Sequence, residues 1–143
     1  MRVLLDTNIV LDVLLARIPW QREADAIFLA AREHRFSAAV TALSIANVFY
    51  VGRRHAGLER AKQAVRACLD ALEVLAVDRI TLEAAIRFTG SDLEDNIQIA
   101  AAIEAGVDAI VTRDPGGFAA SPLAILTPEQ LLASLSEPPS SSG

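Results

Sequence analysis

The chain alternates short apolar runs with longer amphipathic stretches. Val3 to Leu5 is an apolar run typical of a buried strand, and it ends at Asp6. The apolar residues between Ile9 and Leu14 then recur at helical spacing. The same criteria predict strands at residues 2–5, 36–40, 74–77, 109–112 and 123–126. They predict helices at residues 9–14, 20–34, 42–56, 58–72, 81–88, 92–105 and 127–135.

Residues that commonly begin or end helices lie at several of these boundaries. Thr41 is a candidate N-cap, and Gly57 interrupts the helix that follows it. Ser91 is predicted to cap the helix after Gly90, with Glu94 at the capping-box position. Gly106 closes that helix.

Strands that alternate with helices indicate an α/β fold. We expect three layers, with a central and mainly parallel sheet of four or five strands flanked by helices. Residues 1–135 form one predicted domain, and the Pro- and Ser-rich residues 136–143 form a predicted disordered tail. Ligands of such sheets bind beyond the carboxyl ends of the strands, where the strand order reverses.

Composition narrows the class of protein. Of the 143 residues, 52% are hydrophobic, which excludes a wholly disordered or fibrous chain. The net charge of −5 argues against a general polyanion binder. The single cysteine, Cys68, excludes an intramolecular disulfide and a cysteine-based zinc site, and it fits a reducing compartment. The apolar runs are too short for a membrane span and no signal-peptide pattern follows Met1, so we expect a cytoplasmic protein.

Three acidic residues are expected to meet at one edge of the sheet. Asp6 and Asp114 each follow a predicted strand, and Asp95 lies in the first turn of the helix that leads to the fourth strand. Carboxylates that gather without basic partners repel one another unless a hard cation such as Mg²⁺ or Mn²⁺ holds them together. Such a cation binds phosphate oxygens and can activate water for hydrolysis.

Each acid also has a structural interpretation. Asp6 can cap the helix that follows it, and Asp95 can interact with the helix dipole. Asp114 precedes Pro115 and Gly116, which is a common turn pattern. The sequence leaves both interpretations open for each residue taken alone.

The order and spacing of three motifs resemble the PIN-domain ribonucleases, particularly the bacterial toxins of the VapC type. The resemblance covers Val3 to Leu135. The motifs are Asp6-Thr7-Asn8 with Leu11 to Leu14, Asp92 to Gln98 with Ala100 to Ala102, and Ile110 to Asp114 followed by Phe118 and Leu126 to Glu129.

This resemblance implies a PIN-like fold and a metal-dependent endoribonuclease that uses Mg²⁺ or Mn²⁺. Asp6, Asp95 and Asp114 would be the catalytic, metal-binding carboxylates, and Thr112 would support Asp114. Asp92, three residues before Asp95, is either an outer metal ligand or an exposed residue of the helix N-terminus. The family also implies the toxin of a toxin–antitoxin pair, with a small antitoxin partner and a homodimer.

The sequence departs from the family pattern at two positions. Asn47 stands where the family usually has an acid in the helix after the second strand, and Gly117 precedes Phe118 where many relatives have Asp. Hard cations are held largely by carboxylate charge, so each change should weaken metal binding. The alternative function is therefore a catalytically weakened or inactive PIN scaffold that binds RNA or a protein.

Basic residues concentrate in one part of the chain and are either RNA contacts or a solvated helix face. They are Arg53, Arg54, His55, Arg60, Lys62 and Arg66. We select Arg53 and Arg54, together with Arg113, as candidate RNA-binding residues. Trp20 and Tyr50 are candidates for stacking on bases or for the core.

Two further features concern other interactions and functions. Apolar residues at 45–49 and 65–72 are more numerous than one small domain can readily bury, which favours a dimer. A small-molecule hydrolase or nucleotide-binding protein is a third functional class, but the sequence has no Gly-rich phosphate loop. His34 and His55 have no spacing that indicates a catalytic pair or a zinc site.

If the site is only weakened by the missing charge, Asn47→Asp should increase metal-dependent RNA cleavage, because it restores a carboxylate ligand. The measurement is the cleavage rate of the variant and the wild type at equal metal concentration. A folded variant with no gain in rate would count against the weakened-site interpretation.

Overall fold

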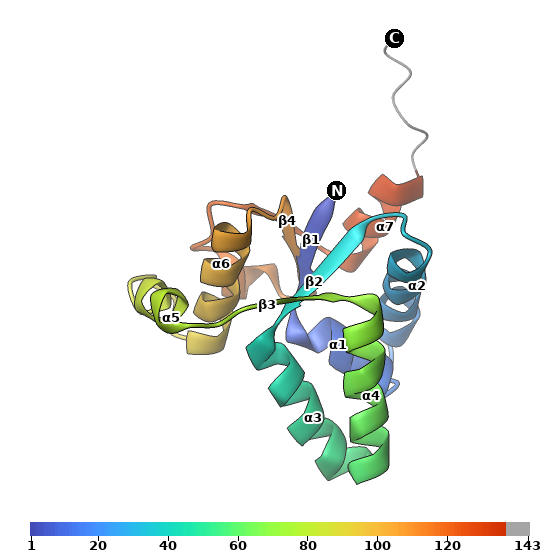
Figure 1. Ribbon diagram of the computed structural model, residues 1–143. Coiled ribbons are helices and arrows are strands. Elements are labelled where there is room, and N and C mark those ends of the chain that lie inside the picture. The colour runs from blue at the N-terminus through green and yellow to red at the C-terminus, as the bar shows by residue number, and fades with distance from the viewer. Residues whose placement is uncertain (137–143) are drawn as a thin grey trace.

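The computed structural model describes residues 1–136, which form a central sheet with helices on both faces (Figure 1). The five strands are β1 (Arg2–Leu5), β2 (Ser37–Thr41), β3 (Glu73–Leu75), β4 (Ala109–Val111) and β5 (Ala124–Leu126). Their order is β3-β2-β1-β4-β5, and every neighbouring pair is parallel. The predicted parallel α/β sheet is confirmed.

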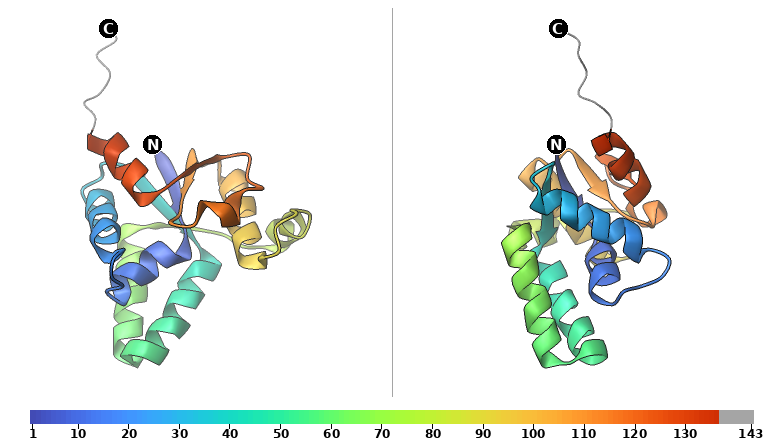
Figure 2. Two further views of the ribbon diagram at one scale, coloured as in Figure 1. Left: turned by 180° about the vertical axis from the view of Figure 1, so that it is seen from behind. Right: turned by 90° about the vertical axis from the view of Figure 1, so that its right-hand side faces the viewer.

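Seven α-helices and one short 3₁₀ helix connect the strands. They are α1 (Thr7–Leu14), α2 (Gln21–Arg32), α3 (Ala42–Ala56), α4 (Leu58–Ala71), α5 (Arg79–Ala85), α6 (Leu93–Ala105), η1 (Pro115–Phe118) and α7 (Pro128–Ser136). Helices α3 and α4 form a hairpin that extends beyond the carboxyl ends of the strands (Figures 1 and 2).

Alternating side chains of the strands build two core layers. Val3 and Leu5 pack against α1, α2, α4 and α7 on one face of the sheet, whereas Leu4 and Ile110 pack against α6 on the other. This follows from the strand geometry, because successive side chains point to opposite faces. All four side chains are fully buried, so the sheet is covered on both sides as expected for a parallel sheet (Figure 2).

Most of the predicted helix boundaries agree with the structure. The Thr41 hydroxyl accepts a hydrogen bond from the Ser44 amide at 3.0 Å, and Gly57 separates α3 from α4 with a φ of +90°. Gly106 ends α6 in the left-handed conformation. The predicted cap of α6 was wrong: Asp92, not Ser91, is the N-cap.

The apolar faces that suggested a dimer are largely covered within the monomer. Val48, Cys68 and Leu72 are at most 6% exposed, and Ile45 packs against the same core cluster. The α3–α4 hairpin therefore buries much of the apolar surface counted in the sequence, since α3 packs on α1 and β2 and α4 packs on α2. The homodimer stays a prediction. Leu69 remains 44% exposed.

Two other predictions concern the membrane and the chain end. No helix among residues 1–136 is long and apolar enough to cross a membrane. Of the predicted tail at 136–143, Ser136 is the last residue of α7, and residues 137–143 lie outside the described part of the chain.

Truncating a core side chain of the sheet should destabilise the fold strongly. Ile110→Ala removes a fully buried side chain of β4, and it should lower the free energy of unfolding by about 3 kcal/mol. Ile86→Ala is the matched control, because Ile86 is 72% exposed, and it should change stability by less than about 0.5 kcal/mol. Urea unfolding followed by circular dichroism measures both, and equal effects would contradict the assignment of the core.

Candidate metal centre

The candidate site lies where the strand order reverses. From β1 the chain proceeds to β2 and β3 on one side, and β4 then pairs with the other side of β1. Leu5 is in register with Val111, and the Asp6 amide donates to the Val111 carbonyl at 2.9 Å. The residues that follow β1 and β4 therefore begin side by side, at the position where ligands bind to such sheets.

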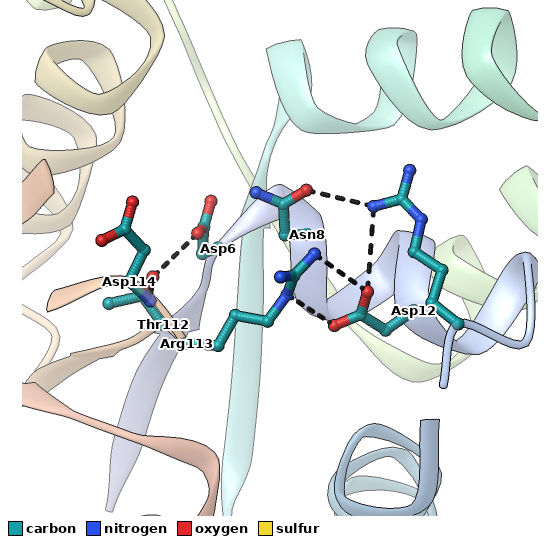
Figure 3. A network of polar contacts seen from close by, with 7 residues as sticks. Asp6, Asn8, Asp12, Thr112, Arg113 and Asp114 are labelled. Carbon is teal, nitrogen blue, oxygen red and sulfur yellow. Dashed lines mark hydrogen bonds and ion pairs between the residues drawn. The ribbon is translucent and has the colours of Figure 1, made fainter. Parts of the chain in front are cut away.

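Asp6 is held by two hydrogen bonds at this edge. The Thr112 hydroxyl donates to Asp6 Oδ2 at 2.9 Å (Figure 3). Gln98 Nε2 donates to Asp6 Oδ1 at 3.2 Å. Asp6 is only 5% exposed, and its side chain makes no capping hydrogen bond to α1. Burial raises the pKa of Asp6, and the bonds from Thr112 and Gln98 oppose that rise. Asp6 therefore occupies the N-cap position of α1, while its two carboxylate oxygens accept from Thr112 and Gln98.

Thr112 connects two of the predicted ligands. Its hydroxyl oxygen, which donates to Asp6, also accepts a hydrogen bond from the Asp114 amide at 3.0 Å. The side chain thus fixes the start of the turn that carries Asp114. This geometry agrees with the predicted supporting role of Thr112.

Helix α6 brings acidic side chains of its first turn to the same edge. Asp92 caps the helix, since its Oδ1 accepts from the Asp95 amide at 3.0 Å. Asp95 makes no comparable side-chain hydrogen bond among the described residues. Burial, and secondly the negative charges of Asp92 and Asp6, raise the pKa of Asp95 to about 7. This carboxyl is therefore the least compensated charge of the group.

Glu94 and Gln98 belong to the site although the sequence did not assign them to it. Glu94 Oε1 accepts from the Thr7 hydroxyl at 2.8 Å, and Thr7 in turn lies 2.6 Å from the Ser44 hydroxyl. Glu94 is thus tied to α1 and α3 instead of closing a capping box. A signal was present for Gln98, because it lies three residues after Asp95 and so on the same face of the helix.

These side chains line a pocket of about 380 Å³ that is mostly polar. The lining residues are Asp6, Thr7, Asn8, Leu11, Asn47, Val51, Asp92, Glu94, Asp95, Asp114 and Phe118. The structure therefore brings together the three predicted carboxylates with Asn47 and Asp92. A second pocket, of about 440 Å³ between α1, α2 and α4, is mainly apolar and has no comparable group of acids.

The donor chemistry of the acidic pocket fits a hard divalent cation, because its ligands are carboxylate and amide oxygens. Within residues 1–136, no three His, Cys, Asp or Glu side chains already stand at metal-binding geometry. Asp6 is fixed by its two hydrogen bonds, whereas Asp114 is exposed and Asp95 is half-buried. Asp6, Asp95 and Asp114 are the carboxylates that would hold such an ion.

Gly117 faces this pocket directly. A Cβ atom at Gly117 would lie 2.7 Å from Asp95 Oδ2 and 3.9 Å from Asp114 Oδ2. The first distance is shorter than a real contact, so any side chain at this position requires Asp95 to move. Position 117 is therefore part of the site, and in this chain the Asp95 carboxylate occupies the space beside it.

The candidate RNA-binding residues lie in different environments. Arg53 and Arg54 are exposed in the last turn of α3, and Arg54 follows Asn47 and Val51 at helical spacing on the pocket side. Arg113 instead contacts the buried Asp12. This placement does not support Arg113 as an RNA contact, because its guanidinium is held against the protein.

The aromatic and histidine candidates lie outside the acidic pocket. Trp20 lies beneath the guanidinium of Arg113, whereas Tyr50 is 62% exposed on α3 and contacts Phe49 edge to face. Neither His34 nor His55 lines the pocket, and both are exposed. Tyr50 remains the aromatic side chain available for stacking.

The raised pKa of Asp95 predicts how stability depends on pH. In the unfolded chain this carboxyl ionises near its usual pKa of 3.8, whereas in the folded protein it does so at about 7. Between about pH 4 and about pH 7 the carboxyl of Asp95 therefore holds a proton in the folded state that it has lost in the unfolded state. The stabilisation that this proton provides is lost as the pH rises from about 4 to about 7.

Asp95→Asn removes this pH dependence. With solvent screening, the variant should be more stable than the wild type by about 2 kcal/mol at pH 8 and about equal to it near pH 4. Urea unfolding at both pH values measures the difference, and Asp25→Asn on the exposed face of α2 is the control. A gain that is the same at both pH values would contradict the assignment.

Comparisons with known proteins identify the family. A family model described as the PIN domain matches residues 2–115. The fold is similar to that of DNA-bound VapBC from Salmonella typhimurium, with a TM-score of 0.69 and 17% identity over 90% of this chain and 98% of the other. FitAcB from Neisseria gonorrhoeae gives a TM-score of 0.67 and 16% identity, over 89% and 98% of the two chains.

A third similar structure is VapC20 from Mycobacterium tuberculosis, which is described as a sarcin-ricin loop cleaving toxin. Its TM-score is 0.63 at 14% identity, over 76% of this chain and 86% of the other. A comparison with curated proteins found no match. At these identities the solved structures show a shared fold alone. The family match, however, spans most of the chain and includes Asp6, Asp95 and Asp114, and the chain therefore belongs to the PIN domain family.

Proposed function

We propose that this protein is a metal-dependent endoribonuclease that hydrolyses RNA phosphodiester bonds. The observation that carries the proposal is the acidic pocket at the ends of β1 and β4, in a chain of the PIN domain family. A similar structure is described as a toxin that cleaves the sarcin-ricin loop, which supports RNA as the substrate class.

Asp6, Asp95 and Asp114 are the proposed ligands of Mg²⁺ or Mn²⁺. When bound, the cation would polarise the phosphate and activate water for in-line attack. Asp6 is oriented for this role by Thr112 and Gln98, so that its position costs no rearrangement when RNA binds. Asp95 exchanges its proton near pH 7, so the proton and the cation compete for this carboxylate.

The exposed end of α3 is the proposed contact for the RNA backbone. Arg53 and Arg54 are exposed cations in the last turn of α3, and Arg54 follows the pocket residues Asn47 and Val51 at helical spacing. Phosphate contacts of this kind position a nucleic acid without reading its sequence. RNA binding through them should weaken as the salt concentration rises.

We also propose that the protein is the toxin of a toxin–antitoxin pair. Three of the similar structures are described as a toxin–antitoxin complex or as VapBC or FitAcB. The proposed partner is a small antitoxin protein, and the proposed state of the toxin is a cytoplasmic homodimer. A binding partner that covers the acidic pocket would restrain cleavage.

The second candidate function is a PIN scaffold that binds RNA or protein without cleaving. Asn47 and Gly117 favour it, because they leave the pocket with fewer carboxylates than the family pattern provides. Glu94 and Asp114 favour the nuclease, because both add negative charge to the same pocket.

Cleavage of a structured RNA by the purified protein distinguishes these functions. With Mn²⁺ or Mg²⁺ we expect cleavage that EDTA abolishes and that Asp6→Asn lowers by about 100-fold or more. Asn has the shape of Asp and removes the charge. Its Oδ1 can still accept from Gln98, whereas its Nδ2 can only donate to the Thr112 hydroxyl, which reverses that hydrogen bond. Asp25→Asn, prepared identically, should cleave like the wild type and controls for a contaminating nuclease.

Cleavage that survives in Asp6→Asn would show that another nuclease is present or that the site is elsewhere. If no metal supports cleavage above the level of the Asp6→Asn preparation, the binding scaffold becomes the better conclusion.

A further inference from the structure

We propose that Arg113 is a positioning residue of the metal centre. Its side chain contacts Asp12 and Trp20 and so holds the β4–η1 turn, which carries Asp114, in a fixed position; we call these contacts the clamp. The inference rests on the proposed function, because the turn carries Thr112 and Asp114. It assigns a role to three residues that do not line the acidic pocket.

The clamp is an ion pair on one side of the guanidinium and an aromatic ring on another. Arg113 Nε lies 3.0 Å from Asp12 Oδ2, and Arg113 Nη2 donates to Asp12 Oδ1 at 3.3 Å (Figure 3). The guanidinium carbon lies 3.6 Å from the centroid of the Trp20 ring. Stacking of this kind attracts the cation to the face of the ring.

The ion pair between Asp12 and Arg113 is shielded from solvent. The side chain of Asp12 is 1% exposed and that of Arg113 is 21% exposed. Among the described residues, neither Asp12 Oδ2 nor Arg113 Nε has a hydrogen-bond partner, so their contact with each other is what compensates them. A buried carboxylate that loses its nearest cation is unfavourable, and Arg113 lies closer to Asp12 than any other cation among the described residues, so its side chain is held in place.

The clamp joins segments that are distant in the sequence. Asp12 belongs to α1, Trp20 precedes α2, and Arg113 follows β4. Arg113 lies between Thr112, whose hydroxyl contacts Asp6, and Asp114, whose amide contacts Thr112. Fixing the side chain of Arg113 on the α1–α2 side therefore limits how far the backbone at 112–114 can move.

A second arginine provides the matched control. Arg17 Nη1 lies 3.8 Å from Asp12 Oδ1 and donates to Asn8 Oδ1 at 3.3 Å. Arg17 thus shares the same carboxylate, but it is attached to the end of α1 and not to β4. Removing it tests the loss of positive charge near Asp12 without releasing the turn.

The experiment compares Arg113→Met with Arg17→Met in the full chain. Hydrogen exchange of peptides that cover residues 111–118, measured without metal, reports whether the turn is released. Mg²⁺ affinity measured by calorimetry reports whether the centre is disturbed. Emission of Trp20, the single tryptophan, reports whether the cation is still on its ring.

We expect faster exchange at 111–118 and Mg²⁺ binding weaker by about tenfold or more in Arg113→Met, with both near wild type in Arg17→Met. The Trp20 emission should change in Arg113→Met, because the cation leaves its ring, and should stay near that of the wild type in Arg17→Met. Unchanged exchange or unchanged Mg²⁺ affinity in Arg113→Met would overturn the proposal, as would equal effects of the two substitutions.

Arg113→Lys keeps the proposal testable if Arg113→Met does not fold. Lysine retains a charge for Asp12 but lacks the planar group that lies over Trp20, so exchange at 111–118 should still increase. Wild-type exchange in Arg113→Lys would then overturn the clamp. If the wild type itself binds neither Mg²⁺ nor Mn²⁺, the proposed metal-dependent function fails, and the exchange data still decide whether Arg113 holds the turn.

Discussion

Repulsion between carboxylates at the ends of β1 and β4 is the constraint to which the rest of this site responds. Asp6 is compensated by hydrogen bonds from Thr112 and Gln98, and Glu94 by one from Thr7. Asp95 has no such partner, and its pKa rises to about 7. The network therefore fixes one carboxylate firmly and leaves another ready to respond to a positive charge, which is the arrangement that a cation site requires.

The layered fold holds these carboxylates in place against their mutual repulsion. The apolar side chains of β1 and β4 are buried on both faces, so the ends of these strands are anchored by the core. On one face α6 carries Asp95 and Gln98 toward the pocket, and on the other α1 carries Asp12 toward Arg113. The acidic centre is thus supported by polar contacts from both layers of helices.

The two departures from the family pattern have different structural meanings. Asn47 lines the pocket and simply replaces a charge by an amide. Gly117 leaves space that the Asp95 carboxylate already occupies, since a Cβ atom there would lie 2.7 Å from its Oδ2. An acid at position 117 would therefore compete with Asp95 for room, whereas an acid at position 47 has no such conflict in the structure.

The sequence by itself determined the parallel α/β fold, most helix boundaries and the set of acids at the strand ends, because periodicity and capping are local properties. It could not determine the roles of Glu94 and Arg113. Glu94 has the spacing of a capping residue, and Arg113 resembles an exposed phosphate contact. Their partners, Thr7 and Asp12, are 87 and 101 residues away in the chain. Only the tertiary structure decided these roles, because the pairing of β1 with β4 and the packing of α6 bring the partners together.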